Sequence, residues 1–298
     1  PFDAQTDSKT STQSIAKAPE ANQQQAPSMV SSITEHRLFV PAIAVLLSIL
    51  AGFIVKSPKL RWLKPLFLIS SIAFFGFYNG GCPCPISSFQ ETLLLPFGVV
   101  LNWESVLWFV ALIPVTYLLG QTWCGWVCHL GAVQEFIFRQ NKFEHLKSEK
   151  AQKIMKNTRI VLFVVLIAQL AATQTNMFCM IDPFKALFNL SSPHTTSWVL
   201  LVLLIISSMF IYRPFCRAVC PIGLTLGLVS LIPGAHKVKR SEHCTGCKTT
   251  SKKCNYQAVT TKDGKSIIKR DDCLNCGDCY ASCVDKCSIR KSNLEANE

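Results

Sequence analysis

The sequence lacks the motifs on which most enzymes and nucleic-acid-binding proteins depend. It contains no evident pairing of a nucleophile with a base, no glycine-rich loop that cradles phosphates, and no motif that reads a nucleic-acid groove. The net charge of +12 would suit nucleic acid, but the basic residues lie beside apolar runs or scattered through the C-terminal end. We therefore expect no nucleic-acid partner, and a membrane explains the charges better.

A secretory signal pattern is also missing, because no charged start is followed by an apolar core and a cleavage site. The chain begins at Pro1 without a methionine, so we expect the native N-terminus to have been lost or processed.

Composition divides the 298 residues into three parts. Residues 1–35 are rich in Gln, Ser, Thr, Ala and Pro, and they predict a disordered periplasmic tail. Residues 36–235 carry nearly all the long apolar runs and predict a transmembrane domain. Residues 236–298 are polar, rich in lysine, and hold eight of the fifteen cysteines.

Apolar runs of nearly spanning length recur in the middle part, at 38–55, 65–79, 105–122, 160–177 and 197–212. Tryptophans near their ends suit the headgroup level of a bilayer: Trp62, Trp103, Trp108, Trp123 and Trp198. The sequence therefore predicts a mostly α fold, a polytopic membrane helix bundle of about five spans.

Among the loops that connect these runs, loops rich in Lys and Arg alternate with loops that have almost none. They are plentiful between the first and second spans, between the third and fourth, and after the fifth. In contrast, residues 80–104 contain none, and the loop between the fourth and fifth spans has only Lys185. Because basic loops stay on the cytoplasmic side, we expect a multi-pass protein of a bacterial cytoplasmic (inner) membrane, with its N-terminus outside and its C-terminus in the cytoplasm.

An internal repeat relates two parts of the membrane domain. The segment QTWCGWVCHLGAVQEF at 121–136 recurs as YRPFCRAVCPIGLTLG at 212–227. Each copy follows an outer loop that contains cysteine and proline, at 80–89 and 177–184. The pattern predicts two parallel hairpin repeats, at about 65–139 and 160–232.

The repeat carries two pairs of cysteines, Cys124 with Cys128 and Cys216 with Cys220. Residues at i and i+4 share a helical face, so we expect each pair to point the same way at the cytoplasmic end of a span. If the ends meet, four sulfurs could hold a metal or cluster, or form a redox-active dithiol layer. The alternative is that small cysteines simply fill helix contacts. His129 follows the first pair as a ligand, a proton relay or an interfacial side chain.

Three further cysteines, Cys82, Cys84 and Cys179, fall in the predicted outer loops. A disulfide between Cys84 and Cys179 is the simple interpretation outside the cytoplasm. The other interpretation is that these cysteines form a second, outer metal or redox centre, which helps electrons to cross the roughly 30 Å of hydrocarbon.

The C-terminal part contains a C-x2-C-x2-C-x3-C run typical of an iron–sulfur cubane, formed by Cys273, Cys276, Cys279 and Cys283. An upstream run resembles it, with Cys244, Cys247 and Cys254, but has Thr250 at the third position. The fourth cysteine of each run binds the other cluster in two-cluster ferredoxins. Cys254 would then complete the cluster of Cys273, Cys276 and Cys279. The other cluster would have Cys244, Cys247 and Cys283, completed by Cys287 or left as an open or three-iron site.

Together, TWCGWVCHLGAVQEF, FCRAVCPIGLTLG and the cysteine-rich tail resemble the membrane-bound polyferredoxins of the NapH and NosR type over about residues 36–290. The resemblance implies paired CxxxCP motifs in a membrane domain and a C-terminal two-cluster bacterial ferredoxin-like domain with two [4Fe-4S] clusters. It implies electron passage between the quinone pool or cytoplasmic donors and periplasmic reductases of nitrogen oxides. The first motif departs from the pattern, because it reads CxxxCH.

We therefore expect a membrane electron-transfer subunit, such as the quinol dehydrogenase component of a respiratory complex. Its expected partners are membrane lipid, quinone or quinol, and other respiratory subunits, including a periplasmic redox protein. Quinol oxidation would need a proton acceptor, for which the candidates are Glu91, Glu104, His129, Glu135, Asp182 and His194. One alternative is a maturation factor of the CcoG type that reduces copper ions or thiols for a respiratory metalloenzyme. Another is a membrane redox sensor.

Overall fold

A computed structural model describes residues 30–81, 84–98, 102–139, 148–176, 178–190, 194–236, 238–240, 251, 253–262, 265–279 and 289–291. Within these ranges the chain is mostly helical, which confirms the predicted class. Among the described residues, strands occur only near the C-terminal end. Of the predicted tail, residues 1–29 lie outside the described part, whereas residues 30–35 already belong to the first helix.

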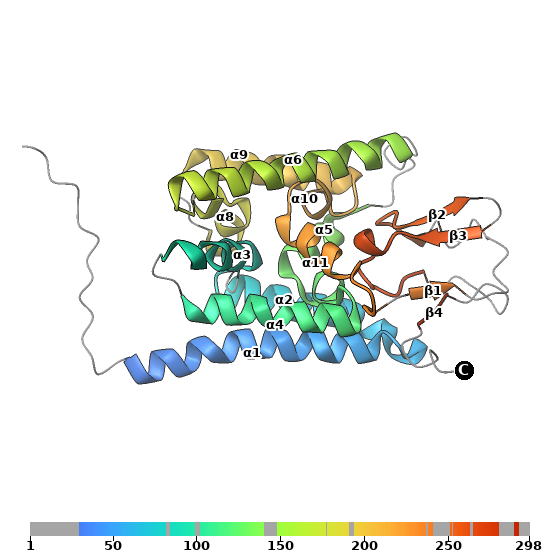
Figure 1. Ribbon diagram of the computed structural model, residues 1–298, viewed down its shortest axis with the longest axis horizontal. Coiled ribbons are helices and arrows are strands. Elements are labelled where there is room, and N and C mark those ends of the chain that lie inside the picture. The colour runs from blue at the N-terminus through green and yellow to red at the C-terminus, as the bar shows by residue number, and fades with distance from the viewer. Residues whose placement is uncertain are drawn as a thin grey trace, which may run out of the picture.

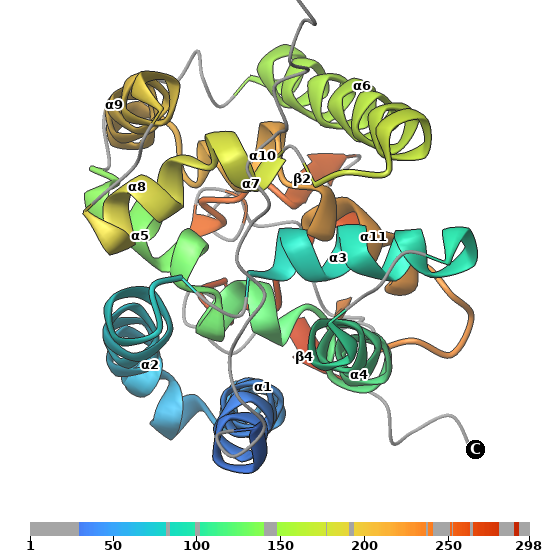
Figure 2. The ribbon, with the colours of Figure 1, turned by 90° about the vertical axis from the view of Figure 1, so that its left-hand side faces the viewer.

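The long helices run along the long axis of the molecule (Figure 1). They are α1 (Val30–Ile54), α2 (Lys64–Ser71) with its π-helical continuation η2 (Ile72–Tyr78), α4 (Trp103–Leu119), α6 (Glu149–Thr173) and α9 (Thr195–Phe210). Seen end-on, they stand around a set of shorter helices (Figure 2). A six-residue 3-10 helix, η1 (Pro58–Leu63), leads into α2.

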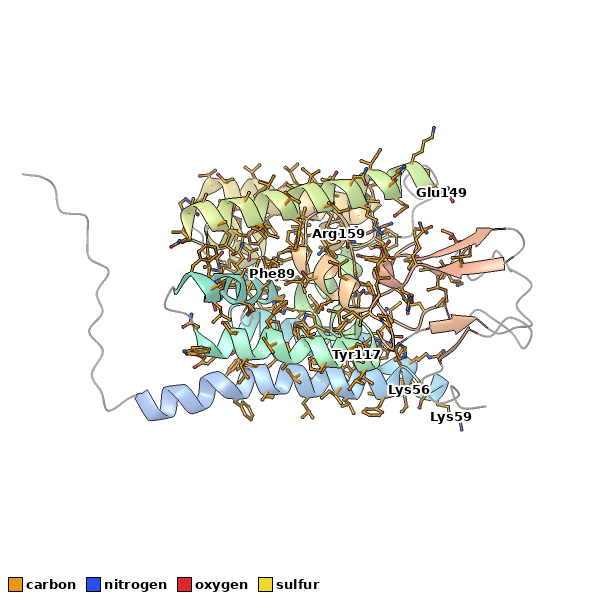
Figure 3. All side chains as sticks on the ribbon, viewed as in Figure 1. Lys56, Lys59, Phe89, Tyr117, Glu149 and Arg159 are labelled. Carbon is orange, nitrogen blue, oxygen red and sulfur yellow. The ribbon has the colours of Figure 1, made fainter. Side chains whose placement is uncertain are left out.

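Two helical segments in the described residues are long and apolar enough to span a membrane, Lys59–Tyr78 and Glu149–Thr173. The apolar helices Phe39–Ile54, Trp103–Leu119 and Thr195–Phe210 are shorter. The predicted bundle of five spans therefore stays a prediction. Large apolar side chains nevertheless cover the outer surface of the long helices (Figure 3). In α6, for example, only Arg159 and Leu170 are buried.

The shorter helices fill the interior of the bundle. They are α3 (Pro85–Leu94), α5 (His129–Ile137), α7 (Phe178–Ile181), α8 (Pro183–Asn189), α10 (Pro214–Ala218) and α11 (Pro221–Val229), with the one-turn η3 (Leu95–Phe97) and the π-helical η4 (Trp123–Val127). Four of them begin at a proline, which has no N–H to donate and suits the first helical position. The residue before that proline is usually extended, as at Cys84, Asp182 and Cys220.

The C-terminal region forms two small antiparallel sheets at one end of the bundle (Figure 1). Strand β1 (Val238–Arg240) pairs with β4 (Ile289–Lys291), so that Lys239 lies opposite Arg290. Strand β2 (Val259–Lys262) pairs with β3 (Lys265–Ile268), so that Thr260 lies opposite Ile267. A turn of 3-10 helix, η6 (Arg270–Asp272), leads from β3 into the cysteine run.

This region packs directly against the ends of the helices. The amide of Asn275 donates a 2.6 Å hydrogen bond to the carbonyl of Leu119, and the hydroxyl of Ser230 donates to the carbonyl of Arg270 at 2.9 Å. Gly227 of α11 lies so close that a Cβ there would be 2.5 Å from the carbonyl oxygen of Asp271. The absence of a side chain at Gly227 therefore lets the C-terminal region approach the bundle.

A buried ion network ties the same surfaces together. Lys64 lies 2.9 Å from carboxylate oxygens of both Glu135 and Asp278, and Arg213 pairs with the other oxygen of Glu135. Burial alone would raise the pKa of the Glu135 carboxyl, but the charges of Arg213 and Lys64 outweigh it and lower the pKa to about 2. Helices α2 and α5, the segment before α10 and the C-terminal loop are thus held by one set of charges.

We expect Glu135→Gln to lower the free energy of unfolding by about 3 kcal/mol, because Arg213 and Lys64 lose a charged partner within the protein. Thermal unfolding of the purified chain measures this, with Glu149→Gln on the exposed end of α6 as the control. Since the pKa of Glu135 is depressed from its ordinary value of 4.5, its stabilisation is present above that pH and is lost as the pH falls toward 2. Equal melting temperatures for both variants at neutral pH would contradict the proposed importance of the network.

Candidate functional site

The two CxxxC pairs do not lie on continuous helices, so the prediction that each pair shares one helical face was wrong. Cys124 lies in η4 and Cys216 in α10, but Cys128 and Cys220 are extended and cap the next helices, α5 and α11. Their backbone angles nearly coincide, at φ −64°, ψ 109° and φ −64°, ψ 117°. Before Pro221 the helical conformation is sterically disfavoured. Cys128 adopts the same conformation although His129 follows it.

The capping position directs backbone N–H groups at both sulfurs. The amides of Leu130 and Gly131 lie near the sulfur of Cys128, and those of Ile222 and Gly223 lie near the sulfur of Cys220, without forming capping hydrogen bonds to them. Each sulfur therefore lies at the N-terminus of a nine-residue helix, where N–H groups and the helix dipole favour negative charge. The sequence contains a signal for this geometry, because glycine follows the second cysteine of each copy at the same spacing, in CHLG and CPIG.

All four of these cysteines line one cavity. Helices α5, α10 and α11, which carry or follow them, lie in the interior of the bundle (Figure 1). The predicted convergence of Cys124, Cys128, Cys216 and Cys220 therefore exists, but inside the bundle and on returning short helices. The amide of Gln134 donates to the sulfur of Cys216 at 3.6 Å. Arg213, which is 1% exposed, donates to the carbonyl of Cys124 and brings a buried positive charge beside the group.

A second cavity is lined by Cys254, Cys273, Cys276 and Cys279. These are the four residues that the cross-ligation pattern predicts for one cluster. Positive φ angles at Asn275 and Gly277 turn the loop around the cavity. The other four predicted cluster ligands, Cys244, Cys247, Cys283 and Cys287, lie outside the described residues.

In this second group Cys254 is buried, and Cys273, Cys276 and Cys279 are half-buried. Burial raises the pKa of Cys254, and the backbone N–H groups of Ala258, Val259 and Gln257 oppose the increase by donating to its sulfur. Burial, followed by the neighbouring Cys273, likewise raises the pKa of Cys279. A bound cation deprotonates a coordinating thiol outright, so the donor set and its N–H groups fit a metal centre that takes thiolates.

Within the described ranges, no group of three His, Cys, Asp or Glu side chains is arranged to hold a single metal ion. The cysteine groups are therefore not arranged as mononuclear sites, in which one ion takes all four donors at about 2.0–2.3 Å. A cubane takes four cysteine thiolates on one cluster, and the two four-cysteine cavities offer that number of donors.

Two side chains separate the two cysteine groups. Tyr256 and Leu274 line both cavities, and the hydroxyl of Tyr256 donates a 3.3 Å hydrogen bond to the carbonyl of Cys216. A Cβ at Gly125 would be 2.5 Å from the carbonyl oxygen of Leu274 and 3.5 Å from the Cα of Cys276. The two groups thus adjoin through a single layer of residues. Reasoning from the sequence missed Tyr256, Leu274 and Gly125, although Gly125 lies between Cys124 and Cys128.

Of the three predicted outer cysteines, the structure describes Cys84 in full and only the backbone of Cys179. Cys84 caps α3 and is buried, and Pro85 beside it lines the cavity of the CxxxC cysteines. Cys82 and the side chain of Cys179 lie outside the described residues, although the backbone of Cys179 belongs to α7. A disulfide or an outer redox centre among these three residues therefore stays a prediction.

Three of the predicted proton acceptors lie within the helical bundle. Glu135 and Asp182 have partners that suit a structural role, whereas both ring nitrogens of His129 have no hydrogen-bond partner among the described residues. His129 is fully buried, with the rings of Phe75 and Phe188 at 6.3 and 5.4 Å from its own. Glu135 belongs to the ion network, and Asp182 caps α8 by accepting a 2.9 Å hydrogen bond from the N–H of Phe184. None of these side chains lines either cysteine cavity.

Comparison with protein families places a 4Fe-4S binding domain twice in the chain, at residues 101–147 and 193–240. The two matches begin 92 residues apart, the same offset as between Cys124 and Cys216. They contain the four CxxxC cysteines and end before the C-terminal run. The chain is therefore a mostly helical protein with a ferredoxin-type 4Fe-4S domain, and the family match falls on the cysteines of the bundle.

Curated relatives agree with this class. An uncharacterized protein of Methanocaldococcus jannaschii is 28% identical over 76% of this chain and 93% of its own length. The electron transport protein YccM of Escherichia coli is 25% identical over 60% of this chain and 53% of its own, and the ferredoxin-type protein NapH of Haemophilus influenzae is 26% identical over 59% and 64%. Regulatory proteins named NosR also match, over about a third of their length. The predicted resemblance to the NapH and NosR type is thereby confirmed. No solved structure matches the chain.

Proposed function

We propose that this chain is a membrane electron-transfer subunit in which two neighbouring iron–sulfur centres form a continuous redox path. The observation that carries the proposal is the pair of four-cysteine cavities that share Tyr256 and Leu274 as walls. The names of the relatives, an electron transport protein and a ferredoxin-type protein, support the same function.

Cys124, Cys128, Cys216 and Cys220 would hold one [4Fe-4S] cluster, and Cys254, Cys273, Cys276 and Cys279 a second. Such clusters supply reversible electron transfer at potentials that burial and hydrogen bonds to sulfur adjust. The protein contributes the helix N-termini at Cys128 and Cys220 and the buried charge of Arg213, all of which favour the more negative, reduced state. Cys244, Cys247, Cys283 and Cys287 remain the predicted ligands of a further cluster.

We place the helical domain in a bacterial cytoplasmic membrane, with the C-terminal region in the cytoplasm. The exposed apolar side chains of the long helices support this, because soluble monomers rarely expose apolar patches of such extent. The alternation of Lys and Arg between loops supports the orientation. Five spans would then surround the cysteine cavity, and the short helices around it would return within the bundle.

An apolar groove between α6 and α9 supports quinol as the electron donor or quinone as the acceptor. The groove has a volume of about 810 Å³, within the size range of small-molecule sites. Gln169 and Ser207 are polar groups in its lining, and Phe215, Val219 and Pro221 form the wall toward Cys216 and Cys220. Electrons would pass between this groove and the C-terminal cysteines, and onward to a periplasmic respiratory reductase system.

We expect Cys124→Ser and Cys254→Ser each to remove about four irons from the anaerobically purified chain, because each substitution takes a ligand from a different cluster. Iron and acid-labile sulfide counts measure the loss. Ser88→Ala is the control, since Ser88 is buried in α3 of the bundle and is not one of the proposed ligands. Unchanged iron in Cys124→Ser would refute the cluster in the bundle.

We expect Leu204→Trp to slow reduction of the chain by a quinol analogue at least about tenfold with its iron content unchanged, because the indole fills the groove. Visible bleaching after mixing measures the rate. Val202→Trp is the control, since Val202 lies on the same helix, is 54% exposed and is not part of the groove. Equal rates in the two variants would exclude this groove as the quinol site.

A further inference from the structure

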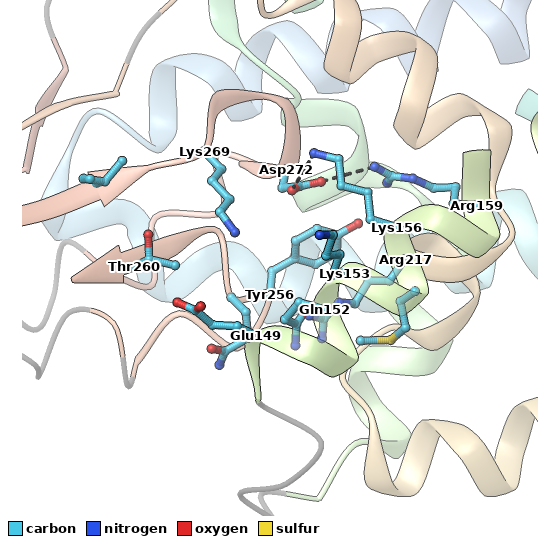
Figure 4. A pocket seen from close by; sticks show the side chains of 13 residues that line it. Glu149, Gln152, Lys153, Lys156, Arg159, Arg217, Tyr256, Thr260, Lys269 and Asp272 are labelled. Atoms are coloured by element: carbon cyan, nitrogen blue, oxygen red, sulfur yellow. Dashed lines mark hydrogen bonds and ion pairs between the residues drawn. The ribbon is translucent and has the colours of Figure 1, made fainter. Parts of the chain in front are cut away.

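A third cavity, of about 460 Å³, opens between α6, α10 and the β2–β3 hairpin (Figure 4). Its lining is rich in basic side chains, with Lys153, Lys156 and Arg159 from α6, Arg217 from α10 and Lys269 after β3. Only two acidic residues, Glu149 and Asp272, are among its described lining residues. The cavity is therefore a site of excess positive charge, and nothing in the proposed redox path requires it.

Part of this charge is already balanced by the protein. Arg159 lies 3.2 Å from a carboxylate oxygen of Asp272, and Lys156 pairs with Asp271 and Asp272. In Figure 4 dashed lines join these side chains along one wall of the cavity. The acidic residue Asp272 is thus paired with Lys156 and Arg159, and it acts on Arg217 only through its charge, without forming an ion pair with it.

Arg217 is the buried cation of this cavity that has no ion-pair partner among the described residues. Its side chain is 7% exposed, its Nη2 has no hydrogen-bond partner, and its guanidinium lies over the ring of Tyr256, 5.3 Å from the ring centre. Burial lowers the pKa of this guanidinium from its ordinary value. Leaving a buried charged donor without a partner is unfavourable, so the arrangement favours an anion that enters the cavity.

Lys153 and Lys269 supply two further cations to the same anion. Both are exposed, both line the cavity, and neither forms an ion pair with a described residue. The apolar part of the lining consists of Met155, Ile267 and the ring of Tyr256. The cavity thus combines charged donors with an apolar wall, which matches an anionic group attached to an organic body.

We propose that this cavity binds the phosphate group of an organic phosphate, with Arg217 as the buried donor and Lys153 and Lys269 at the rim. A guanidinium forms paired hydrogen bonds with phosphate, and lysines add point charges. The organic body would pack against Met155, Ile267 and Tyr256. A soluble nucleotide and the headgroup of an anionic phospholipid share this chemistry.

The position of the cavity gives the ligand a consequence for the redox path. Tyr256 lines this cavity as well as both cysteine cavities. A phosphate held by Arg217 would place negative charge beside the side chain that separates the two cysteine groups. Binding itself does not depend on the proposed electron transfer, so the two can fail separately.

Titration calorimetry of the full chain in detergent, freed of lipid, tests the proposal with two probes. One is adenosine monophosphate and the other is soluble dihexanoyl phosphatidylglycerol, with adenosine as the control that lacks phosphate. We expect saturable binding of at least one probe and none of adenosine. The tighter probe identifies the source of the phosphate, either a nucleotide or a lipid.

Variants of the cavity distinguish a site from general attraction to a basic protein. We expect Arg217→Gln to weaken binding about tenfold or more, because a charge-assisted hydrogen bond is lost. Lys153→Gln, on the exposed side of the cavity, should weaken binding less and leave the fold intact. Lys59→Gln removes an equal charge away from the cavity and should bind as the unmodified chain does (Figure 3).

Three results would overturn the proposal. One is the absence of saturable binding for both probes. Another is that Arg217→Gln and Lys153→Gln bind the phosphate probes as tightly as Lys59→Gln does. The third is binding of polyglutamate without binding of either phosphate probe, which would instead indicate an acidic protein surface as the occupant.

Discussion

The close contact between η4 and the C-terminal cysteine loop is the constraint on which the arrangement of the molecule depends. Gly125 has no side chain, and any Cβ there would meet the carbonyl of Leu274. The contact brings the loop of Cys273, Cys276 and Cys279 against the helices that carry the CxxxC cysteines. Gly227 permits a similar approach at Asp271, and the ion network of Lys64, Glu135 and Asp278 holds the same surfaces.

The contact also explains how an apolar bundle can accommodate buried charge. Arg213 and Lys64 are nearly inaccessible, and each is compensated by Glu135 or Asp278. Glu135 is part of the helical bundle and pairs with both cations there, whereas Asp278 belongs to the C-terminal region. Assembly of the two regions therefore adds a second carboxylate to buried Lys64 and, under the proposed function, brings the two redox centres side by side.

Much of the chemistry could be predicted from the sequence, because spacing constrains it directly. The duplicated cysteine pairs predicted four converging sulfurs, and the offset between the two cysteine runs predicted that Cys254 joins Cys273, Cys276 and Cys279. Both groupings occur as cavities in the structure. Whether they hold clusters is the proposal that the iron counts test.

The remainder depends on long-range packing that sequence patterns do not record. The hydrophobic runs gave no sign that the cysteines lie on short helices that return into the bundle, because a broken helix and a continuous one have similar composition there. Tyr256 and Leu274 acquire their role from contacts across 40 residues or more, such as that of Tyr256 with Cys216. The unpaired Arg217 became a candidate donor only when its neighbours were known.

Electron paramagnetic resonance of the chemically reduced chain tests the central claim most directly, since neighbouring paramagnetic centres couple magnetically. We predict a spectrum that differs from a corrected sum, namely the spectra of Cys124→Ser and Cys254→Ser added together minus the spectrum of the double variant. The subtraction ensures that the further predicted cluster, which all three variants retain, is counted once. Displacing the loop with Gly125→Val should weaken this difference while both clusters remain. A spectrum equal to that sum would contradict the account, because the two centres would then be magnetically independent.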